Sequence, residues 1–288
     1  IHNKDKAIAV SGDSSANYCK SYPLTGGKQI VCENWRNLIT VGAKPLAITN
    51  CLNFGNPENK EIMGEFAECL EGIKQACEFL NYPVVSGNVS FYNGTNKKNI
   101  YPTPVIGGVG LIKKLLKPLS HNFKKNNSTL ILIGKTFGHL EQSCFLKENY
   151  SISEGMPPEV NLSNEKNNGE ALLKLIDKKL IISSHDVSSG GLITALSEMS
   201  IGSSFGAKIF KPKKLTNLYE YFFGEDQARY IIEIETNDLV KTEKILKENN
   251  VYFENIGFTQ KEFFEVDNEL KIKTNELFKI NNEWYNNY

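Results

Sequence analysis

The sequence predicts an α/β (α+β) protein built from two domains. Three observations lead to this prediction: the chain has 288 residues, apolar strands alternate with amphipathic helices along it, and hairpins near its end interrupt that alternation. A chain of this length usually organises more than one hydrophobic core. The hairpins favour a mixed α/β sandwich over a doubly wound parallel sheet.

The first domain, residues 1–115, is predicted to combine short strands with two amphipathic helices. One helix is expected from about Lys28 to Val41, opened by Gly26-Gly27. The clearest helix is Asn59 to Leu80, whose apolar residues repeat at the i, i+4, i+7 spacing of a surface helix. The expected strands are Lys6–Val10, Pro45–Thr49, Pro83–Ser86 running into Gly87, and Thr103–Ile112.

A basic, asparagine-rich stretch that contains Pro118 separates the two predicted domains, with residues 116–127 as the linker. Its lysines could suggest a nucleic-acid patch, but it lacks interleaved aromatic residues, so a solvated linker is favoured. The second domain spans 128–288. Its expected elements are strand Thr129–Ile133, helix Asn164–Ile176, strand Leu180–Ser183, loop His185–Gly191 with a helix through Met199, strand Tyr230–Glu235, helix Asn237–Asn249, strands Val251–Gly257, Phe263–Val266 and Leu270–Ile272, and a final helix ending at Trp284.

The composition excludes several classes of function. With 33 basic and 33 acidic residues, no global field would recruit nucleic acid or an acidic membrane. The amino terminus has no signal-peptide profile, no stretch has the length of a transmembrane helix, and the six cysteines, none in CxxC spacing, are typical of reduced thiols. These features predict a cytoplasmic location. The missing initiator Met suggests a piece of a longer chain.

A first candidate site lies on the predicted helix after Gly26-Gly27. Free N–H groups at a helix amino terminus favour an anion. Glu33 and Asn37 are four residues apart, so they share a face, and two oxygen ligands one turn apart suit a Mg²⁺ ion that is also held by phosphates. The alternative is a solvent-facing helix with ordinary polar residues.

A second candidate site consists of two loops, Asn50–Pro57 and Ser86–Ser90, each expected at the end of an apolar strand. Gly87 could let backbone amides approach a phosphate, Asn88 could offer an oxygen to a metal, and Ser90 could bond a substrate. Asparagine-rich turns use the same residue types, so both interpretations stay open.

The segments His185–Gly191 and Phe223–Arg229 supply two more candidates. In the first, Asp186 could bind a metal, and Ser188 with the glycines meets the start of a helix, which can hold phosphate. His185 is expected to pack or hydrogen-bond without a direct couple to Asp186, because adjacent residues of an extended segment point apart. The second segment is a polar ligand loop or a structural turn. The sequence contains neither a P-loop nor a Rossmann fingerprint.

Taken together and in order, these segments resemble the second of two homologous halves in the synthetase subunit of phosphoribosylformylglycinamidine synthase. The resemblance covers nearly the whole chain, and LNFGNP with SGNVSFYN is its most specific part. The matching runs are GGKQIVCENWRNLITVGAKPLAIT, LNFGNP, YPVVSGNVSFYN, YPTPVIGGVGLI, SSHDVSSGGLITALSEM and FGEDQAR.

The resemblance implies a PurM-like two-domain fold, as in aminoimidazole ribonucleotide synthetase. A small α/β domain, here lacking its first strand, pairs with its counterpart into a barrel, and a larger α/β sandwich domain follows. The implied reaction uses ATP, Mg²⁺ and ammonia to convert formylglycinamide ribonucleotide to formylglycinamidine ribonucleotide in purine biosynthesis. The implied partners are the missing first half of the subunit, a glutaminase and a small adaptor subunit, with no nucleic acid and no membrane.

The resemblance also assigns roles to single positions. Gly87 and position 50 would contact ATP, Asn88 would bind Mg²⁺ and Ser90 the ribonucleotide substrate. At a second, auxiliary nucleotide site, Mg²⁺ and nucleotide would be held by Glu33, Asn37, Asp186 and Ser188.

The chain departs from the family pattern in ways that bear on activity. Asn50, Ser189 and Asp226 stand where the family has Asp, Asp and Ser, and Glu141-Gln142 replace two glycines. The family's catalytic histidine and activating lysine lie in the first half, so no catalytic residue is expected here and the chain alone is expected to be inactive. Two functions therefore stay open: one wall of a shared ligase site, or a noncatalytic half that holds structural nucleotide.

Overall fold

The computed structural model describes residues 1–96, 98–114, 119–212 and 217–286. The chain divides into two compact units, one formed by Ile1–Pro118 with Leu140–Lys166 and the other by Leu119–His139 with Asn167–Tyr288. Residues 140–166, expected in the second domain, thus pack with the first unit. Residues 116–118 of the expected linker lie outside the described residues, and Phe123, further along that linker, is buried in the core of the second unit.

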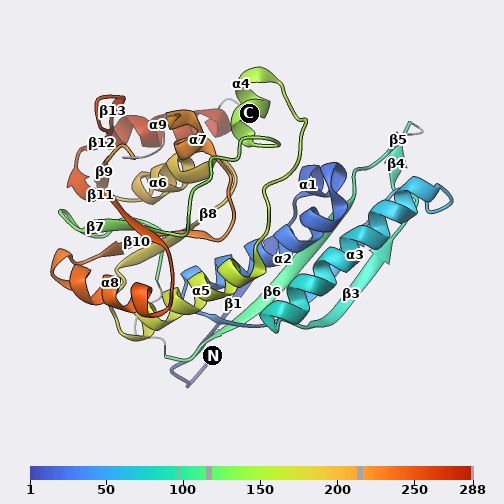
Figure 1. Cartoon of the computed structure of the whole chain (residues 1–288), viewed down its shortest axis with the longest axis horizontal. Helices are drawn as coiled ribbons and strands as arrows, with labels where there is room; N and C mark the ends of the chain where they lie inside the picture. Colours follow the sequence, from blue (N-terminus) through green and yellow to red (C-terminus); the bar gives the residue numbers. More distant parts are fainter. Residues whose placement is uncertain (97, 115–118, 213–216, 287–288) are drawn as a thin grey trace. The chain divides into compact units, whose positions relative to one another are not determined.

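The first unit is a four-stranded sheet in the order β1-β6-β2-β3, with helices over one face (Figure 1). β2 and β3 are parallel, and the other neighbouring pairs are antiparallel. Its elements are β1 (Ala7–Asp13), α1 (Ala16–Ser21), α2 (Pro23–Thr40), β2 (Lys44–Asn53), α3 (Lys60–Leu80), β3 (Val84–Ser90), the small pair β4 (Gly94–Thr95) and β5 (Lys98–Asn99), β6 (Thr103–Ile112) and α4 (Cys144–Tyr150).

Helices α2 and α3 pack against each other through glycines. Gly27 of α2 leaves room for the carbonyl oxygen of Cys69 on α3, and Gly72 of α3 does the same for Leu24 on α2, so a Cβ at either glycine would collide with backbone. Because α2 begins at Pro23, Gly26-Gly27 lie inside the helix. The predicted anion site at a glycine-opened helix terminus is therefore wrong, and the glycines serve close helix packing instead.

The second unit is a seven-stranded sheet in the order β13-β12-β9-β11-β7-β10-β8, covered on both faces (Figure 1). α6, α7 and α9 lie over one face and α8 over the other, with α5 (Leu162–Asp177) entering this unit at Asn167. The other elements are β7 (Thr129–Ile133), β8 (Ser183–Val187), α6 (Gly191–Ile201), β9 (Phe205–Ile209), α7 (Leu218–Phe223), β10 (Arg229–Ile234), η1 (Thr236–Asp238), α8 (Leu239–Glu248), β11 (Phe253–Lys261), β12 (Phe263–Val266), β13 (Leu270–Lys273) and α9 (Thr274–Asn286).

The inner strand β7, which lies between β11 and β10, explains why both faces of this sheet need helices. All five residues of β7 are buried, with Leu130 and Leu132 packed into the core cluster under α6. Since side chains alternate along a strand, Ile131 and Ile133 must be buried on the opposite face. The result is the mixed α/β sandwich that the sequence predicts.

Three polar segments expected in loops belong to strands. β2 continues beyond Thr49 to Asn53, β3 continues beyond Ser86 to Ser90, and His185–Val187 lie in β8, whose expected position was residues 180–183. Asn, Ser and Gly have low strand propensity, which suggested turns, but pairing with a neighbouring strand overrides that local preference.

Candidate functional site

The first group of predicted residues lies on the parallel strands β2 and β3. Asn50 pairs with Gly87, and the register continues through Asn53 opposite Ser90. A Cβ at Gly87 would collide with Oδ1 of Asn50, so the glycine makes room for this amide. The structure therefore brings Asn50 and Gly87 together as one feature, with Asn88 next to it in β3.

The two faces of β3 divide the predicted roles. Asn88 and Ser90 are two residues apart, so their side chains share one face of the sheet. Asn50 lies on the other face, between the buried Ile48 and Leu52 in β2, where α2 and α3 cover the sheet. The residues expected to contact metal and substrate thus project away from the helices.

Asn93 was not predicted and holds the end of β3. Its side-chain amide donates to the carbonyl oxygens of Ser90 and Phe54, both at 2.9 Å, and Ser90 Oγ lies 3.3 Å from Asn93 Oδ1. These bonds tie β3 to the segment after β2. The run SGNVSFYN contained this residue, but nothing in its spacing indicated the contact.

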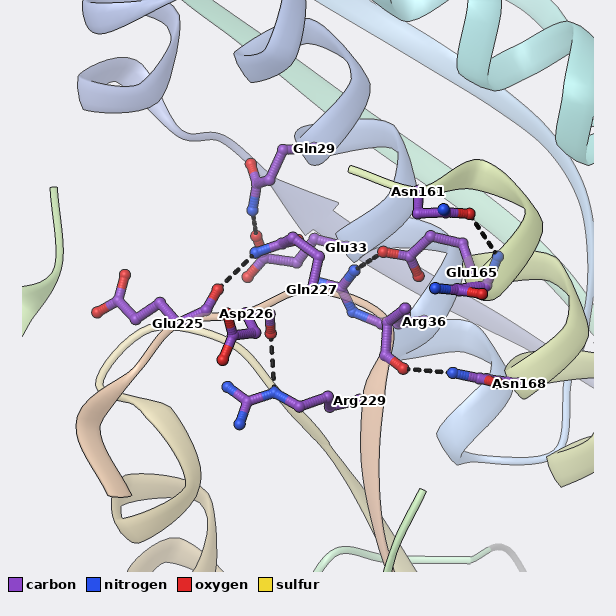
Figure 2. Close-up of polar contacts among 12 residues, drawn as sticks. Gln29, Glu33, Arg36, Asn161, Glu165, Asn168, Glu225, Asp226, Gln227 and Arg229 are labelled. Carbon is purple, nitrogen blue, oxygen red and sulfur yellow. Dashed lines mark hydrogen bonds and ion pairs between the residues drawn. The ribbon is translucent and has the colours of Figure 1, made fainter. Parts of the chain in front are cut away.

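The second group lies on α2, where Glu33 and Asn37 are one turn apart as predicted. Gln29 donates to Glu33, as Figure 2 shows, and Asn37 Nδ2 donates to Asp13 Oδ1 at 2.7 Å. The buried Asn34 donates to Asp13 Oδ2, also at 2.7 Å. Asp13 was not predicted, because the first strand was expected to end at Val10 and the polar residues after it were expected to have no role in a site.

The oxygen atoms of this second group are of the chemical kind that Mg²⁺ prefers, but both oxygens of Asp13 already accept hydrogen bonds from the protein. An ionised carboxylate can only accept hydrogen bonds, so the amide nitrogen of Asn37 faces Asp13. The amide oxygen of Asn37 therefore points away from Asp13. Carboxylates of Asp13 and Glu33 with an amide oxygen are hard ligands. Among the residues that the structure describes, no group of three or more His, Cys, Asp or Glu side chains is arranged to hold a metal ion.

The third group lies in the second unit, at the end of β8. Asp186 is buried, and His185 contacts it: Nδ1 is 2.7 Å from the Asp186 carbonyl oxygen and 3.4 Å from its carboxylate. Nε2 of His185 is 3.2 Å from Glu198. The expectation of no direct couple is wrong, because the imidazole folds back along the main chain toward its own neighbour.

The contacts of His185 determine its charge. Burial alone would lower its pKa, but hydrogen bonds to Asp186 and Glu198 outweigh burial and raise the pKa to about 10. The ring of His121 lies 5.4 Å from that of His185, and burial together with this neighbouring positive charge lowers the pKa of His121. A protonated His185 is suited to hold Asp186 and unsuited to act as a general base.

The helix start next to Ser188 is partly occupied by the chain itself. α6 begins at Gly191, as the sequence suggested, and Gly190 adopts a left-handed conformation with φ 78°. The N–H of Gly190 donates to Glu225 Oε1 at 2.8 Å, and the N–H of Gly191 donates to the Ser188 carbonyl oxygen at 3.1 Å. An amide expected to face phosphate therefore faces a carboxylate.

The segment Phe223–Arg229 forms a buried structural turn. Asp226 accepts hydrogen bonds from the N–H groups of Phe137, Gly138 and His139 at 2.9, 2.8 and 3.3 Å. Arg229 is fully buried and donates to the carbonyl oxygen of Asp226, as drawn in Figure 2. Of the two interpretations left open for this segment, its contacts favour the structural turn.

A polar pocket of about 460 Å³ lies elsewhere in the first unit. Lys20 of α1, Tyr101 and Lys147 of α4 are among the residues that line it. None of the predicted site residues lines this pocket.

Within the described part of the chain, no helix is long and apolar enough to cross a membrane.

Two known domain families match successive parts of the chain. Residues 1–112 match the family described as "AIR synthase related protein, N-terminal domain", and residues 125–266 match its "C-terminal domain". The chain is 55% identical over all 288 residues to the phosphoribosylformylglycinamidine synthase subunit PurL of Pelagibacter ubique, and 41% identical to that of Rhodopseudomonas palustris. It spans 40% and 39% of the length of these relatives.

Solved structures share the fold at low sequence identity. Thermotoga maritima PurL, solved in complex with FGAR, superposes with a TM-score of 0.78 at 16% identity, over 95% of this chain and 46% of that one. A thiamine-monophosphate kinase from Stenotrophomonas maltophilia superposes with a TM-score of 0.68 at 13% identity, over 92% and 86%. The predicted PurM-like fold is thereby confirmed. The chain belongs to the AIR synthase related family and, within it, to the synthetase subunits of phosphoribosylformylglycinamidine synthase, corresponding to their carboxy-terminal half.

Proposed function

We propose that this chain forms one wall of an ATP-dependent carbon–nitrogen ligase site, that of phosphoribosylformylglycinamidine synthase. The observation that carries the proposal is the sheet face that bears Asn88 and Ser90. On that face the first unit exposes apolar side chains, while its helices α2 and α3 lie over the other face. A surface of this kind is suited to a macromolecular partner that completes the site.

The apolar part of this surface comes from β1 and β6. Ile8, Val10 and Val109 are 59%, 74% and 39% exposed, and Val10 lies opposite Val109 in the antiparallel pair. Exposed apolar side chains grouped on one surface are typical of interaction sites. The proposed occupant is the first half of the synthetase subunit, which the relatives contain in the larger share of their length that this chain does not match.

The proposed roles on β2 and β3 are those that the resemblance to the family implies. Asn50 and Gly87 contact the nucleotide, Asn88 offers its amide oxygen to Mg²⁺, and Ser90 bonds the ribonucleotide substrate. Solved complexes of Thermotoga maritima PurL with ATP, AMPPCP and FGAR support these ligand classes. When bound, Mg²⁺ offsets negative charge on the phosphates.

The proposed reaction has two steps, and this chain's residues bind and orient in both. The amide oxygen of formylglycinamide ribonucleotide attacks the γ-phosphorus of ATP, and ADP leaves. Ammonia then attacks the activated carbon, and phosphate leaves with the original amide oxygen. Ser90 would hold the substrate and Asn88 would hold the Mg²⁺ ion, while proton transfer belongs to residues outside this chain. The chain alone is therefore predicted to be inactive.

The remaining partners are proposed from the same relatives. A solved assembly from Thermotoga maritima is named PurLQS, which supports further subunits: a glutaminase that supplies ammonia and a small adaptor. The cytoplasmic location expected for purine biosynthesis stays a prediction.

A noncatalytic half that holds structural nucleotide is the second candidate function. In this function, Glu33 and Asn37 of α2 offer oxygen ligands to Mg²⁺ in the first unit. In the second unit, Asp186 of β8 offers one to a metal, and Ser188 contacts nucleotide. In this case the residues of β3 would have no part in turnover.

Complementation in trans separates the two functions. This chain is combined with the remainder of the Pelagibacter ubique relative, and ADP formation is measured with ammonia, ATP and formylglycinamide ribonucleotide. We expect Asn88→Ala to lower the rate at least about 100-fold, because the Mg²⁺ ion that offsets charge on the phosphates would lose a ligand. Asp186→Ala serves as the matched variant of the auxiliary residues and is expected to lower the amount of assembled complex more than the rate per complex. An Asn88→Ala complex that turns over like the wild type would refute the proposal.

A further inference from the structure

Two adjacent carboxylates in the second unit occupy positions that normally attract external anions. Glu225 accepts the Gly190 N–H at the start of α6, at 2.8 Å. Asp226 accepts three consecutive backbone N–H groups, those of Phe137, Gly138 and His139. Both carboxylates are almost completely buried, with 2% and 4% of their surface exposed.

The three amides around Asp226 have the arrangement of an oxyanion site. Successive backbone N–H groups that converge on one point form a concavity that binds carboxylate or phosphate oxygens. Here the N–H groups of Phe137 and Gly138 meet the same carboxylate oxygen, and that of His139 meets the other. A carboxylate is therefore already bound, and it belongs to the chain.

Hydrogen bonds from the Arg229 side chain hold the turn that carries Asp226. The guanidinium donates to the carbonyl oxygens of Gly224 at 2.6 Å and Asp226 at 2.9 Å, and to Thr136 Oγ1 at 3.1 Å. These bonds join the turn to the residue directly before the three amides. The Asp226 carboxylate is part of the chain and is already held in place, so its binding to the three amides costs little translational or conformational entropy. A free anion would have to lose that entropy on binding and therefore competes poorly.

We propose that Phe137, Gly138 and His139 form an oxyanion site whose resident ligand is Asp226, so that the site is closed to external small carboxylates in this chain and opens when Asp226 is shortened. The inference does not rest on the proposed ligase function, since it concerns the isolated chain. It identifies Asp226 as the residue that determines what this site binds.

Chemical rescue by formate tests the inference on the full chain. Asp226→Ala removes the carboxylate and leaves space for one formate ion beside three unsatisfied N–H groups. We expect the melting temperature of this variant to fall by at least about 4 °C. Formate at about 100 mM should restore half or more of that fall, relative to chloride at the same ionic strength, and should not shift the wild type.

Two further variants keep the test decisive. Asp226→Asn has the same shape, but its amide nitrogen cannot accept, so it should be destabilised without formate rescue because no space is free. Asp238→Ala removes a more exposed carboxylate, bonded at 2.9 Å to Lys241, and should show no formate response. If Asp226→Ala does not fold in chloride, its soluble yield should rise with formate. An Asp226→Ala variant that responds equally to formate and chloride, or an Asp226→Asn variant as stable as the wild type, would overturn the inference.

Discussion

At the scale of single residues, Gly87 shows how a small residue serves a candidate site. Its backbone leaves space for the side chain of Asn50, whose Oδ1 occupies the place of a Cβ. The missing Cβ of Gly87 thus makes room for the Asn50 side chain in β2, whatever role the glycine has toward a ligand. Both residues could be selected from the sequence, each with a separate contact to ATP, but their contact with each other depends on the pairing of β2 with β3 and was not predicted.

This contact predicts a coupled pair of substitutions. Gly87→Ala should lower the free energy of unfolding by about 1–3 kcal/mol, because the new Cβ forces the Asn50 amide to move. In an Asn50→Ala background the same substitution should cost less by at least about 0.5 kcal/mol. Urea unfolding of the four variants measures this coupling.

Gly64→Ala is the matched control for this pair. Gly64 is exposed on α3, and a Cβ there would meet nothing within 4 Å. Alanine should therefore stabilise the helix by about 0.5–1 kcal/mol. Equal costs for Gly87→Ala with and without Asn50 would contradict the proposed contact.

At the scale of elements, one buried ion pair attaches the start of α5 to α2 within the first unit. Arg36 and Glu165 approach to 2.6 Å with both side chains fully buried (Figure 2). Removing one member of such a pair leaves an uncompensated buried charge. This contact belongs to the segment 140–166 that the structure groups with the first unit.

Replacing one member of this pair should lower the free energy of unfolding much more than replacing both. Arg36→Met or Glu165→Leu alone should destabilise the chain by about 3–5 kcal/mol, and the two together by clearly less than either alone. Denaturant unfolding followed by circular dichroism measures this. Lys244→Met, at an exposed pair with Glu248, should change stability by no more than about 0.5 kcal/mol. Additive costs at Arg36 and Glu165 would contradict the pairing.

Elements with strong periodicity could be predicted, and elements defined by distant partners could not. Thr103–Ile112 and Thr129–Ile133 have the predicted bounds because their apolar residues match a buried strand. The polar ends of β2, β3 and β8 were taken for loops, since their strand state depends on pairing that no local pattern reveals. The helices α1, α4 and α7 were missed; they have six or seven residues, too few to show a helical repeat.

The candidate sites follow the same division. Residue types and spacing were enough to select Glu33 and Asn37 on one face of α2, and the structure confirms that face. Asp13 and Asn93 could not be predicted, because each acts through a fold contact with residues far from it in sequence. The same holds for Asp226, whose three amide partners lie 87 to 89 residues away.

At the scale of the whole molecule, the proposed function depends on a sheet face that exposes apolar side chains. The chain spans about 40% of the length of its relatives, and its first unit exposes Ile8, Val10 and Val109 on the face that carries Asn88 and Ser90. A partner that covers these apolar residues would bury them and complete the site at the β3 edge. The same face thus connects the fold to the proposed ligase function.

Binding of the chain to the remainder of the Pelagibacter ubique relative tests this claim most directly. Val10→Asp introduces a charge among the exposed apolar residues of β1 and β6, and burying it unpaired should weaken association by at least about 100-fold. The control is Val240→Asp, at a residue of α8 that is 78% exposed in the second unit. Isothermal titration calorimetry with the purified chains is predicted to give tight binding for the wild type and Val240→Asp, and weak or no binding for Val10→Asp. Undiminished binding by Val10→Asp would contradict the account.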